Sequence, residues 1–574
     1  MSGPTPPGSS SGAKYPGGPG AEPPAGRTGP APGPKPLLAI DRLSVAIRGR
    51  QVLRDISLSI AAGEILALTG ESGSGKSMTA FATMGLLPGG ATAGGRILLD
   101  GTDLLGLSEP ALCALRGREI GMIFQEPMTA LNPLQTIGAQ VTETILVHRA
   151  MARPAARRRA QEILARVGLP PDRVPMRRYP HELSGGQRQR VVIAMAMALR
   201  PRLLIADEPT TALDVTTQAQ VLALLEDLVR EEGLALMLIT HDLAVVADVA
   251  HRIAVMKDGA IVEEGGTAAL LAGMRHPYTK QLFDASRHRA VLHESAPAGP
   301  LLRVDGVVRD YPQPRASLFG PVRSFRAVDH VGFDIARGER VGLVGESGCG
   351  KSTLARAILG LDRIQAGRIT LGERPVFTEG RPDRAVRRRI QAVFQDPYGS
   401  FDPRHRVGRL IAEPFHLLDD PPAGADRDRA VGRALRDVGL DPADADRQIH
   451  AFSGGQRQRI AIARALIIRP DLVIFDEAVS ALDVRVRAQI LDLIADLSRQ
   501  YGLAYLFVSH DLSVVRSITD RVLVMRAGRI VEQGPTASVF DNPTNWYTKS
   551  LLEAAPVLPA PAGGGETDAG QPVP

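Results

Sequence analysis

The chain has 574 residues, too many for one comfortable hydrophobic core, so its length predicts two domains of a few hundred residues each. An apolar content of 44% can fill both cores, and 68 basic residues against 62 acidic ones give a mixed surface that is weak evidence for a nucleic-acid partner. Only two cysteines, Cys113 and Cys349, indicate a reducing compartment and argue against a disulfide framework or a cysteine-ligated cluster.

Residues 1–36 and 556–574 are rich in proline and glycine and are predicted to be disordered. The N-terminal stretch has no apolar h-region and is not predicted to be a secretory signal. The longest apolar run, VVIAMAMAL at Val191–Leu199, has the length of a buried helix, so no membrane span is expected.

Two short apolar runs end in glycine, as buried parallel strands do: EILALTG at Glu64–Gly70 and RVGLVG at Arg340–Gly345. Each continues through G-x-x-x-x-G-K-S into a helix-like stretch. The N–H groups of such a loop converge on phosphates, its lysine reaches the β/γ-phosphates and its serine binds Mg²⁺. A flexible glycine loop is the alternative, but two copies in one context predict nucleotide binding. The residues concerned are Gly70, Glu71, Ser72, Gly73, Ser74, Gly75, Lys76, Ser77, Met78, Gly345, Glu346, Ser347, Gly348, Cys349, Gly350, Lys351, Ser352 and Thr353.

The segment from about Leu105 to Pro180 is predicted to be a helical insertion, because ARPAARRRAQEILARVGL within it has the pattern of an amphipathic helix. Two glutamines stand in similar contexts, Gln125 in IFQEP and Gln395 in VFQDP. Taken alone, these glutamines carry little information, and a surface or turn position is the plain interpretation.

The stretch SGGQRQR occurs twice, at an offset of 453 − 184 = 269 residues. Its serine offers a hydroxyl, its glycines allow close backbone approach, and the helix that QRQR begins points N–H groups toward an anion. A plain helix N-cap is the alternative. A second phosphate-facing device must approach the nucleotide from the side opposite the first loop. The two copies are Ser184, Gly185, Gly186, Gln187 and Ser453, Gly454, Gly455, Gln456.

Two apolar runs end in paired acids, LLIADE with Asp207 and Glu208, and LVIFDE with Asp476 and Glu477. Adjacent carboxylates at the mouth of a buried strand are costly unless a cation or a proton relay uses them. We assign the aspartates to Mg²⁺, through water, and the glutamates to the base that orients the attacking water. Capping of the following helix is the alternative.

A histidine follows another apolar run in each half, His241 and His510, 33 residues after each glutamate (241 − 208 and 510 − 477). A lone histidine there would be structural. In this fixed order with the acids and the glycine loops, each is predicted to sense the γ-phosphate and organise hydrogen bonds.

The whole domain is duplicated, because these motifs and the YTK at Tyr278–Lys280 all return at offsets of 269 to 275 residues. The predicted organisation is a first domain at 37–286, which carries the HPYTKQL stretch at its end, a linker at 287–300, and a second domain at 301–555. Below, 37–286 is the first half and 301–555 the second half.

In this order, and in both halves, the motifs resemble those of ATP-binding-cassette ATPases over nearly all of Leu38–Ala555. The resemblance implies an α/β fold of two tandem P-loop NTPase domains, each with a RecA-like α/β core, an antiparallel β subdomain and a helical insertion. It also implies that ATP and Mg²⁺ bind in a sandwich, where the P-loop of one half and the SGGQ of the other enclose each ATP. The first site would join 70–77 to 453–456, and the second 345–352 to 184–187.

The resemblance also assigns roles to single residues. The implied catalytic residues are Glu208, Glu477, His241, His510, Gln125 and Gln395. The implied metal-binding residues are Ser77, Gln125, Asp207, Ser352, Gln395 and Asp476. Tyr311, in RDYPQP, matches the family's adenine-stacking aromatic, whereas Ile47 takes that place in the first half and has no π face, so we expect weaker nucleotide affinity at the first site.

Finer features look like the oligopeptide/dipeptide importer ATPases. HPYTKQL at His276–Leu282 resembles their C-terminal extension, and QEPMTALNP and QDPYGSFDPR resemble their glutamine loops. That branch usually has two separate subunits, and this chain resembles the fused form. The second half has Asn545 and Trp546 where histidine and proline are expected, which leaves the role of its extension open.

The resemblance therefore predicts the ATPase of an importer of di- or oligopeptides, or of related solutes such as nickel chelates or glutathione. Its place would be peripheral, at the cytoplasmic face of the inner membrane. Two membrane permeases and, indirectly, a solute-binding protein are the expected partners, and no nucleic acid is expected. The alternatives are a soluble twin-cassette ATPase acting on ribosomes, which the short Pro/Ala-rich linker disfavours, a DNA-repair cassette ATPase, and the ATPase of an exporter.

Overall fold

The computed structural model describes residues 35–559 except 150, 212, 294–297, 314–323, 397–398 and 481. The predicted tails, 1–36 and 556–574, lie outside the described residues apart from their inner ends. Part of the predicted linker, 294–297, also lies outside them.

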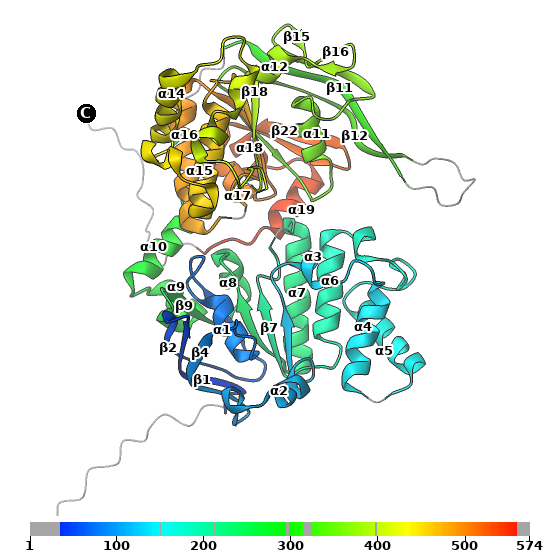
Figure 1. Cartoon of the computed structure of the whole chain (residues 1–574). Coiled ribbons are helices and arrows are strands. Elements are labelled where there is room, and N and C mark those ends of the chain that lie inside the picture. Colours follow the sequence, from blue (N-terminus) through cyan, green and yellow to red (C-terminus); the bar gives the residue numbers. More distant parts are fainter. Residues whose placement is uncertain are drawn as a thin grey trace, which may run out of the picture. The chain divides into compact units, whose positions relative to one another are not determined.

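The first half contains two β-sheets (Figure 1). An antiparallel sheet has the order β2-β1-β4-β5, and a six-stranded sheet has the order β10-β9-β3-β8-β7-β6, in which only β10 runs antiparallel. The strands are β1 Leu38–Ile47, β2 Arg50–Ile60, β3 Ile65–Thr69, β4 Ala91–Leu99, β5 Thr102–Asp103, β6 Ile120–Ile123, β7 Leu203–Asp207, β8 Ala235–Ile239, β9 Arg252–Lys257 and β10 Ala260–Gly266.

The predicted buried strand is β3, whose five residues are all buried. Ile65 and Ala67 belong to one hydrophobic core and Leu66 and Leu68 to another, so the two faces of the strand meet different layers. Burial on both faces is why this strand has an unbroken apolar sequence. By contrast, Ile56–Ile60 in β2 alternates between buried and more exposed positions, as its sequence predicts.

The first half also contains helices, some of which cover its six-stranded sheet. They are α1 Lys76–Thr83, α2 Glu109–Leu115, α3 Pro127–Ala130, α4 Ile137–His148, α5 Arg153–Arg166, α6 Gly185–Ala196, α7 Val215–Glu232, α8 Leu243–Val249, α9 Thr267–Ala272 and α10 Pro277–Ser286, with 3₁₀ turns at Leu104–Gly106 and Pro180–Glu182. Among the described residues, every helix is too short or too polar to cross a bilayer.

The predicted helical insertion, from about Leu105 to Pro180, is too long, because it includes a strand of the core sheet. Strand β6, Ile120–Ile123, lies inside it and pairs in parallel with β7 of the core sheet. The apolar IGMI was too short to stand out from its surroundings, and only its pairing identifies it as a strand. The helical part proper is α4 and α5, the cyan pair that packs beside α6 in Figure 1.

The second half repeats this plan, with an antiparallel sheet β12-β11-β14-β15 and a core sheet β18-β19-β20-β13-β21-β22. Its strands are β11 Pro300–Pro312, β12 Ser324–Ala336, β13 Arg340–Val344, β14 Ala366–Leu371, β15 Arg374–Pro375, β16 Phe377–Thr378, β17 Arg381–Pro382, β18 Ile390–Phe394, β19 Leu472–Asp476, β20 Ala504–Val508, β21 Arg521–Arg526 and β22 Arg529–Pro535. The small pair β16-β17 has no counterpart among the described strands of the first half.

The helices of the second half follow the same order as those of the first. They are α11 Lys351–Ile358, α12 Arg384–Arg389, α13 Val407–Ile411, α14 Gly424–Asp437, α15 Gly454–Leu466, α16 Val484–Tyr501, α17 Leu512–Ile518, α18 Thr536–Asp541 and α19 Trp546–Ala554, with 3₁₀ turns at Glu413–Leu417, Pro442–Asp446 and Ile449–Ala451.

The second glycine of SGGQ is explained by helix packing. A Cβ on Gly186 would lie 2.2 Å from Cγ2 of Thr217 on α7, whereas a Cβ on Gly185 would find its nearest atom, on Leu213, at 3.7 Å. Gly455 repeats the close approach, 2.3 Å from Cγ1 of Val486 on α16. From the sequence, both glycines of SGGQ are expected to allow close approach of a ligand to the backbone. The structure shows that Gly186 and Gly455 are needed for the contact between neighbouring helices.

We therefore expect Gly186→Ala to lower the melting temperature of the protein by several degrees. Thr217 is β-branched and its hydroxyl is bonded to Asp214 at 3.0 Å, so it yields little and overpacking costs about 1–3 kcal/mol. The matched control is Gly185→Ala, which should keep or raise the melting temperature because alanine favours helix over glycine. Equal melting temperatures of the two variants would contradict this account.

Candidate functional site

The candidate site of the first half lies where parallel strands end together. Strand β3 leads into the P-loop at Gly70, β7 ends at Asp207, and β8 ends at Ile239, directly before Thr240 and His241. Asp207 pairs in register with Ile239. The carboxyl ends of parallel strands meet at one edge, which is where α/β sheets bind ligands. The fold therefore brings the three predicted motifs together.

The P-loop is wrapped around its own lysine. Lys76 is only 6% exposed, and its ammonium donates to the carbonyl oxygens of Gly70 at 2.9 Å and Glu71 at 2.8 Å. Burial lowers the pKa of Lys76. Gly70 has φ 149°, and a Cβ there would lie 2.2 Å from the carbonyl oxygen of Met256, so only glycine fits.

The second P-loop has the same geometry. The Lys351 ammonium donates to the carbonyls of Gly345 at 2.7 Å and Glu346 at 2.9 Å. A Cβ on Gly345 would lie 2.1 Å from the carbonyl oxygen of Met525. Both lysine ammonium groups are thus held by converging backbone carbonyls next to the ends of the strands.

The aspartate at the end of β7 suits a cation. Asp207 is 3% exposed, it hydrogen-bonds Ser77, and its Oδ1 has no hydrogen-bond partner among the described residues. Burial raises the pKa of Asp207 to about 6. In the second half Ser352 Oγ donates to Asp476 Oδ1 at 3.2 Å, and burial raises the pKa of Asp476. A buried carboxylate beside a serine hydroxyl is a donor set that Mg²⁺ accepts.

The neighbouring glutamate is held by three partners. Gln125 Nε2 donates to Glu208 Oε2 at 2.8 Å, Thr211 Oγ1 donates to the same oxygen at 2.9 Å, and His241 Nδ1 lies 3.0 Å from Oε1. Burial alone would raise the pKa of Glu208, but the hydrogen bonds with His241, Thr211 and Gln125 lower it to about 2. The predicted glutamine, glutamate and histidine therefore meet.

Both glutamates sit on strained backbone, with φ 49° at Glu208 and φ 52° at Glu477. Residues with side chains adopt this left-handed region rarely, and such strain clusters at functional sites. In the second half His510 Nδ1 lies 3.3 Å from Glu477 Oε1. Burial of Glu477 would raise its pKa, and the hydrogen bond with His510 brings it below the ordinary value.

Thr211 is a residue that the sequence reasoning missed. The signal was present, because a hydroxyl residue stands three positions after each glutamate, Thr211 and Ser480. Their contacts differ, since Ser480 Oγ donates to the backbone carbonyl of Glu477 at 2.9 Å instead of its carboxylate.

The serine of each SGGQ is a helix N-cap. Gln187 N donates to Ser184 Oγ at 3.2 Å, and Ser184 N donates to Gln187 Oε1 at 3.1 Å. The reciprocal bonds recur between Ser453 and Gln456, at 3.4 and 3.0 Å. This is a capping box, which explains the spacing of serine and glutamine. The serine hydroxyl can still donate its hydrogen, so the cap and a contact with phosphate are compatible.

Tyr311 stands at the end of β11 and is held from two directions. Its hydroxyl donates to Asp362 Oδ2 at 2.8 Å, and the guanidinium of Arg309 lies 4.4 Å from the ring centroid. A nucleobase would therefore have to stack on the opposite face of the ring. That Tyr311 binds adenine, and that the site with Ile47 is weaker, stay predictions.

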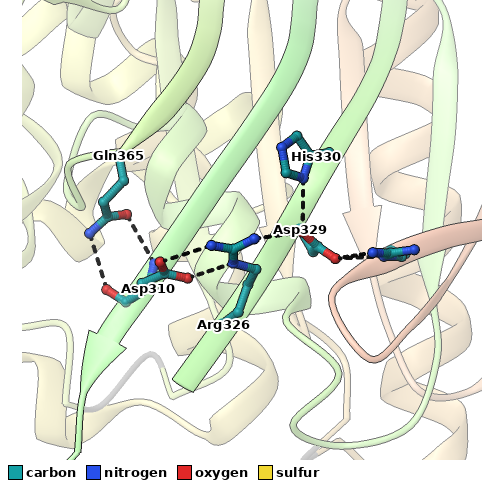
Figure 2. A network of polar contacts seen from close by, with 6 residues as sticks. Asp310, Arg326, Asp329, His330 and Gln365 are labelled. Atoms are coloured by element: carbon teal, nitrogen blue, oxygen red, sulfur yellow. Dashed lines mark hydrogen bonds and ion pairs between the residues drawn. The ribbon is translucent and has the colours of Figure 1, made fainter. Parts of the chain in front are cut away.

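A network of polar side chains, shown in Figure 2, braces the strand that carries Asp310, the neighbour of Tyr311 in the chain. Arg326 on β12 binds Asp310 at 2.9 Å and Asp329 at 3.3 Å, and Gln365 pairs with the backbone of Asp310 at 2.9 and 3.1 Å. Hydrogen bonds from His330 and Arg529 lower the pKa of Asp329 to about 2. The network ties the end of β11 to β12 and β22.

A buried P-loop lysine, a buried or partly buried aspartate and a glutamate–histidine pair at the ends of parallel strands define each half as a P-loop ATPase domain. The sequence profile described as ABC transporter matches residues 53–211 and 328–480, and the chain belongs to this family. The profile described as oligopeptide/dipeptide transporter, C-terminal region, matches 262–293 and 531–573. It therefore covers the extension of the second half as well, whose role the sequence left open.

Curated relatives match nearly the whole chain. One is 47% identical over 91% of this chain and 96% of its own length, a peptidoglycan transport ATP-binding protein, YejF, of Agrobacterium fabrum. An uncharacterized ABC transporter ATP-binding protein YejF of Escherichia coli is 46% identical over 90% of this chain and 99% of its own length. A glutathione import ATP-binding protein, GsiA, of Pectobacterium atrosepticum is 45% identical over 88% and 86%.

The predicted fold class and ATPase activity are confirmed. The chain is an ATP-binding and ATP-hydrolysing ABC subunit with two cassette domains in one polypeptide.

Proposed function

We propose that this chain is the fused ATPase of an importer for short peptides or peptide-containing solutes. The observation that carries the proposal is the oligopeptide/dipeptide-type extension, present after both cassettes of a chain with two P-loop sites. The relatives named for peptidoglycan and for glutathione support it, because both solutes contain short peptide chains.

The translocation path belongs to other chains in this proposal. The expected partners are two membrane permeases and, indirectly, a solute-binding protein. This chain would lie peripherally on the cytoplasmic face of the membrane, and the permeases would dock near the glutamine loops at Gln125 and Gln395. ATP binding would close the two halves and hydrolysis would reopen them, which drives alternating access of the permeases.

The residues of each site divide the work of hydrolysis. Lys76 and Lys351 neutralise the β/γ-phosphates, and the P-loop N–H groups orient them. Mg²⁺ would be held by Ser77 and Asp207 in one half and by Ser352 and Asp476 in the other. When bound, it neutralises charge on the phosphates.

The glutamate must be released before it can act on water. In the structure both carboxylate oxygens of Glu208 are engaged, by Gln125 and Thr211 on one side and His241 on the other. We propose that the γ-phosphate draws Gln125 and His241 toward itself, which frees Glu208 to orient and deprotonate the attacking water. Until then the low pKa of Glu208 makes it a poor base.

Each ATP site would be completed by the SGGQ stretch of the opposite half. Ser453–Gln456 would face the nucleotide on Lys76, and Ser184–Gln187 the nucleotide on Lys351. The N-terminal ends of α15 and α6 have the N–H groups and the dipole direction for this task.

The transport proposal is tested by uptake in the native cells. We expect deletion of this chain to abolish uptake of a labelled tripeptide or of glutathione, and the wild-type chain to restore it. The Glu208→Gln, Glu477→Gln double variant should not restore uptake. Loss of nickel uptake alone, or sedimentation of the chain with ribosomes instead of membranes, would contradict the proposal.

The glutamate assignment is tested with purified protein. The double variant Glu208→Gln, Glu477→Gln should bind ATP as before and hydrolyse it at least about 100-fold more slowly, because it lacks the base. Glu226→Gln, on the middle of α7, is the matched control and should keep its rate. A double variant that hydrolyses ATP at the normal rate would remove both glutamates from the mechanism.

The proposed contact between each SGGQ serine and the nucleotide of the opposite half is tested with a substitution that keeps the helix cap. Aspartate caps helices as well as serine does, but its charge repels phosphate. Ser453→Asp should keep the melting temperature and reduce photolabelling by an azido-ATP chiefly in the half with Lys76. Ser184→Asp should reduce it chiefly in the half with Lys351. Unchanged labelling of both halves would leave the serines as caps only.

A further inference from the structure

The C-terminal extension of each cassette places a buried tyrosine against its own P-loop. Glu71 N donates to the hydroxyl of Tyr278 at 3.1 Å, and Glu346 N donates to the hydroxyl of Tyr547 at 3.0 Å. The two tyrosines are 2% and 3% exposed. Neither is among the residues predicted from the sequence, although YTK is one of its repeated motifs.

The peptide group that donates to each tyrosine also holds the lysine. In the peptide between Gly70 and Glu71, the N–H donates to Tyr278 and the carbonyl of Gly70 accepts from the Lys76 ammonium at 2.9 Å. In the second half, the peptide between Gly345 and Glu346 donates to Tyr547, and its Gly345 carbonyl accepts from the Lys351 ammonium at 2.7 Å. One peptide group thus connects each extension to the group that neutralises the phosphates.

The tyrosines are fixed by anchors that the two halves build from different residues. Tyr278 N donates to His276 Nδ1 at 3.2 Å, and Tyr547 N donates to Asn545 Oδ1 at 2.9 Å. Asn545 therefore caps the helix in place of the expected histidine. The cap keeps the tyrosine at the start of α10 or α19, whichever residue supplies it.

A carboxylate of the core sheet holds the start of each extension. Glu263 on β10 accepts from the backbone N–H groups of Arg275 at 2.7 Å and His276 at 3.1 Å. Glu532 on β22 accepts from Thr544 N at 2.7 Å and Asn545 N at 3.3 Å. Because the extension is bound to the sheet that carries the P-loop, its tyrosine has a fixed distance to that loop.

We propose that Tyr278 and Tyr547 are positioning residues for ATP binding. Each hydroxyl fixes the peptide that carries the carbonyl next to the P-loop lysine, so that the loop is preorganised for the phosphates. This arrangement serves substrate and transition state alike, so its loss weakens ATP binding more than the rate of hydrolysis. The extension thereby contributes to the nucleotide site of its own cassette.

The test uses Tyr278→Phe and Tyr547→Phe in chains with one working site. The Lys351→Ala chain keeps the first site and the Lys76→Ala chain keeps the second. Tyr278→Phe should weaken Mg-ATP binding about 3- to 10-fold in the Lys351→Ala chain, the effect of one lost hydrogen bond, and leave the Lys76→Ala chain unchanged. Tyr547→Phe should do the reverse. In the otherwise wild-type chain, KM for ATP should rise while kcat changes less than about twofold.

Tyr501→Phe is the matched control. It removes a hydroxyl that hydrogen-bonds Asp437 at 2.6 Å, outside the P-loop contacts, and should leave ATP affinity unchanged. A structural role alone would lower the melting temperature of the Tyr278→Phe and Tyr547→Phe chains without this crossed pattern of affinities. ATP affinities equal to those of the Tyr501→Phe control in both single-site chains would overturn the proposal.

The only tryptophan of the chain gives an independent reading for the second half. Trp546 lies beside Tyr547, with ring centroids 6.0 Å apart, and is 61% exposed. ATP binding to the Lys76→Ala chain should change its fluorescence, and Tyr547→Phe should shift the midpoint of that titration by the same 3- to 10-fold. A midpoint that does not move would count against the proposal.

Discussion

Each site depends on one interaction, a buried ammonium held by the carbonyls of its own loop. Lys76 and Lys351 have left water almost completely, which is costly for a charge unless oxygen atoms surround it. The P-loop supplies two carbonyls to each lysine, and it can do so only because Gly70 and Gly345 let the chain pass against β9 and β21. The core sheet then fixes where this cradle lies relative to the acids on β7 and β19.

The same constraint links the periphery of each cassette to its centre. The extension contacts the P-loop through one tyrosine hydroxyl, and the lysine binds the carbonyl on the other side of the same peptide group. The two halves reach this geometry with different caps, His276 and Asn545, because either side chain can accept from the tyrosine N–H. What is duplicated is therefore the geometry of the contact, and the residues differ where their hydrogen bonding is equivalent.

The halves differ at the position that is predicted from the sequence to stack on the base. Tyr311 is oriented by Asp362 and Arg309, and a charged network braces its strand, whereas the first half has Ile47 at the matching position. The groups predicted to act in hydrolysis are more alike in the two halves, because both glutamates have positive φ and a histidine within 3.3 Å. Differences between the two ATP sites should thus arise in binding of the base before they arise in chemistry.

The sequence predicted the elements whose signals are local. The P-loops, the buried strands before them and the acids at strand ends follow from apolar runs, glycines and spacing, and all of them are found. Strand β6 was missed because four apolar residues carry no period of their own, and it became a strand by pairing with β7. The sequence offered two readings of SGGQ, cap and phosphate contact, and the structure shows the cap.

By itself, the sequence determined that the chain is two copies of one nucleotide-binding domain, because a repeated set of motifs at nearly constant spacing leaves few other folds. Tertiary structure alone decided which side chains share a hydrogen bond. Thr211 and Gln125 reach Glu208, and Tyr278 reaches Glu71 across 207 residues of chain. Such contacts are set by how strands and helices pack, and a residue's neighbours along the chain do not record them.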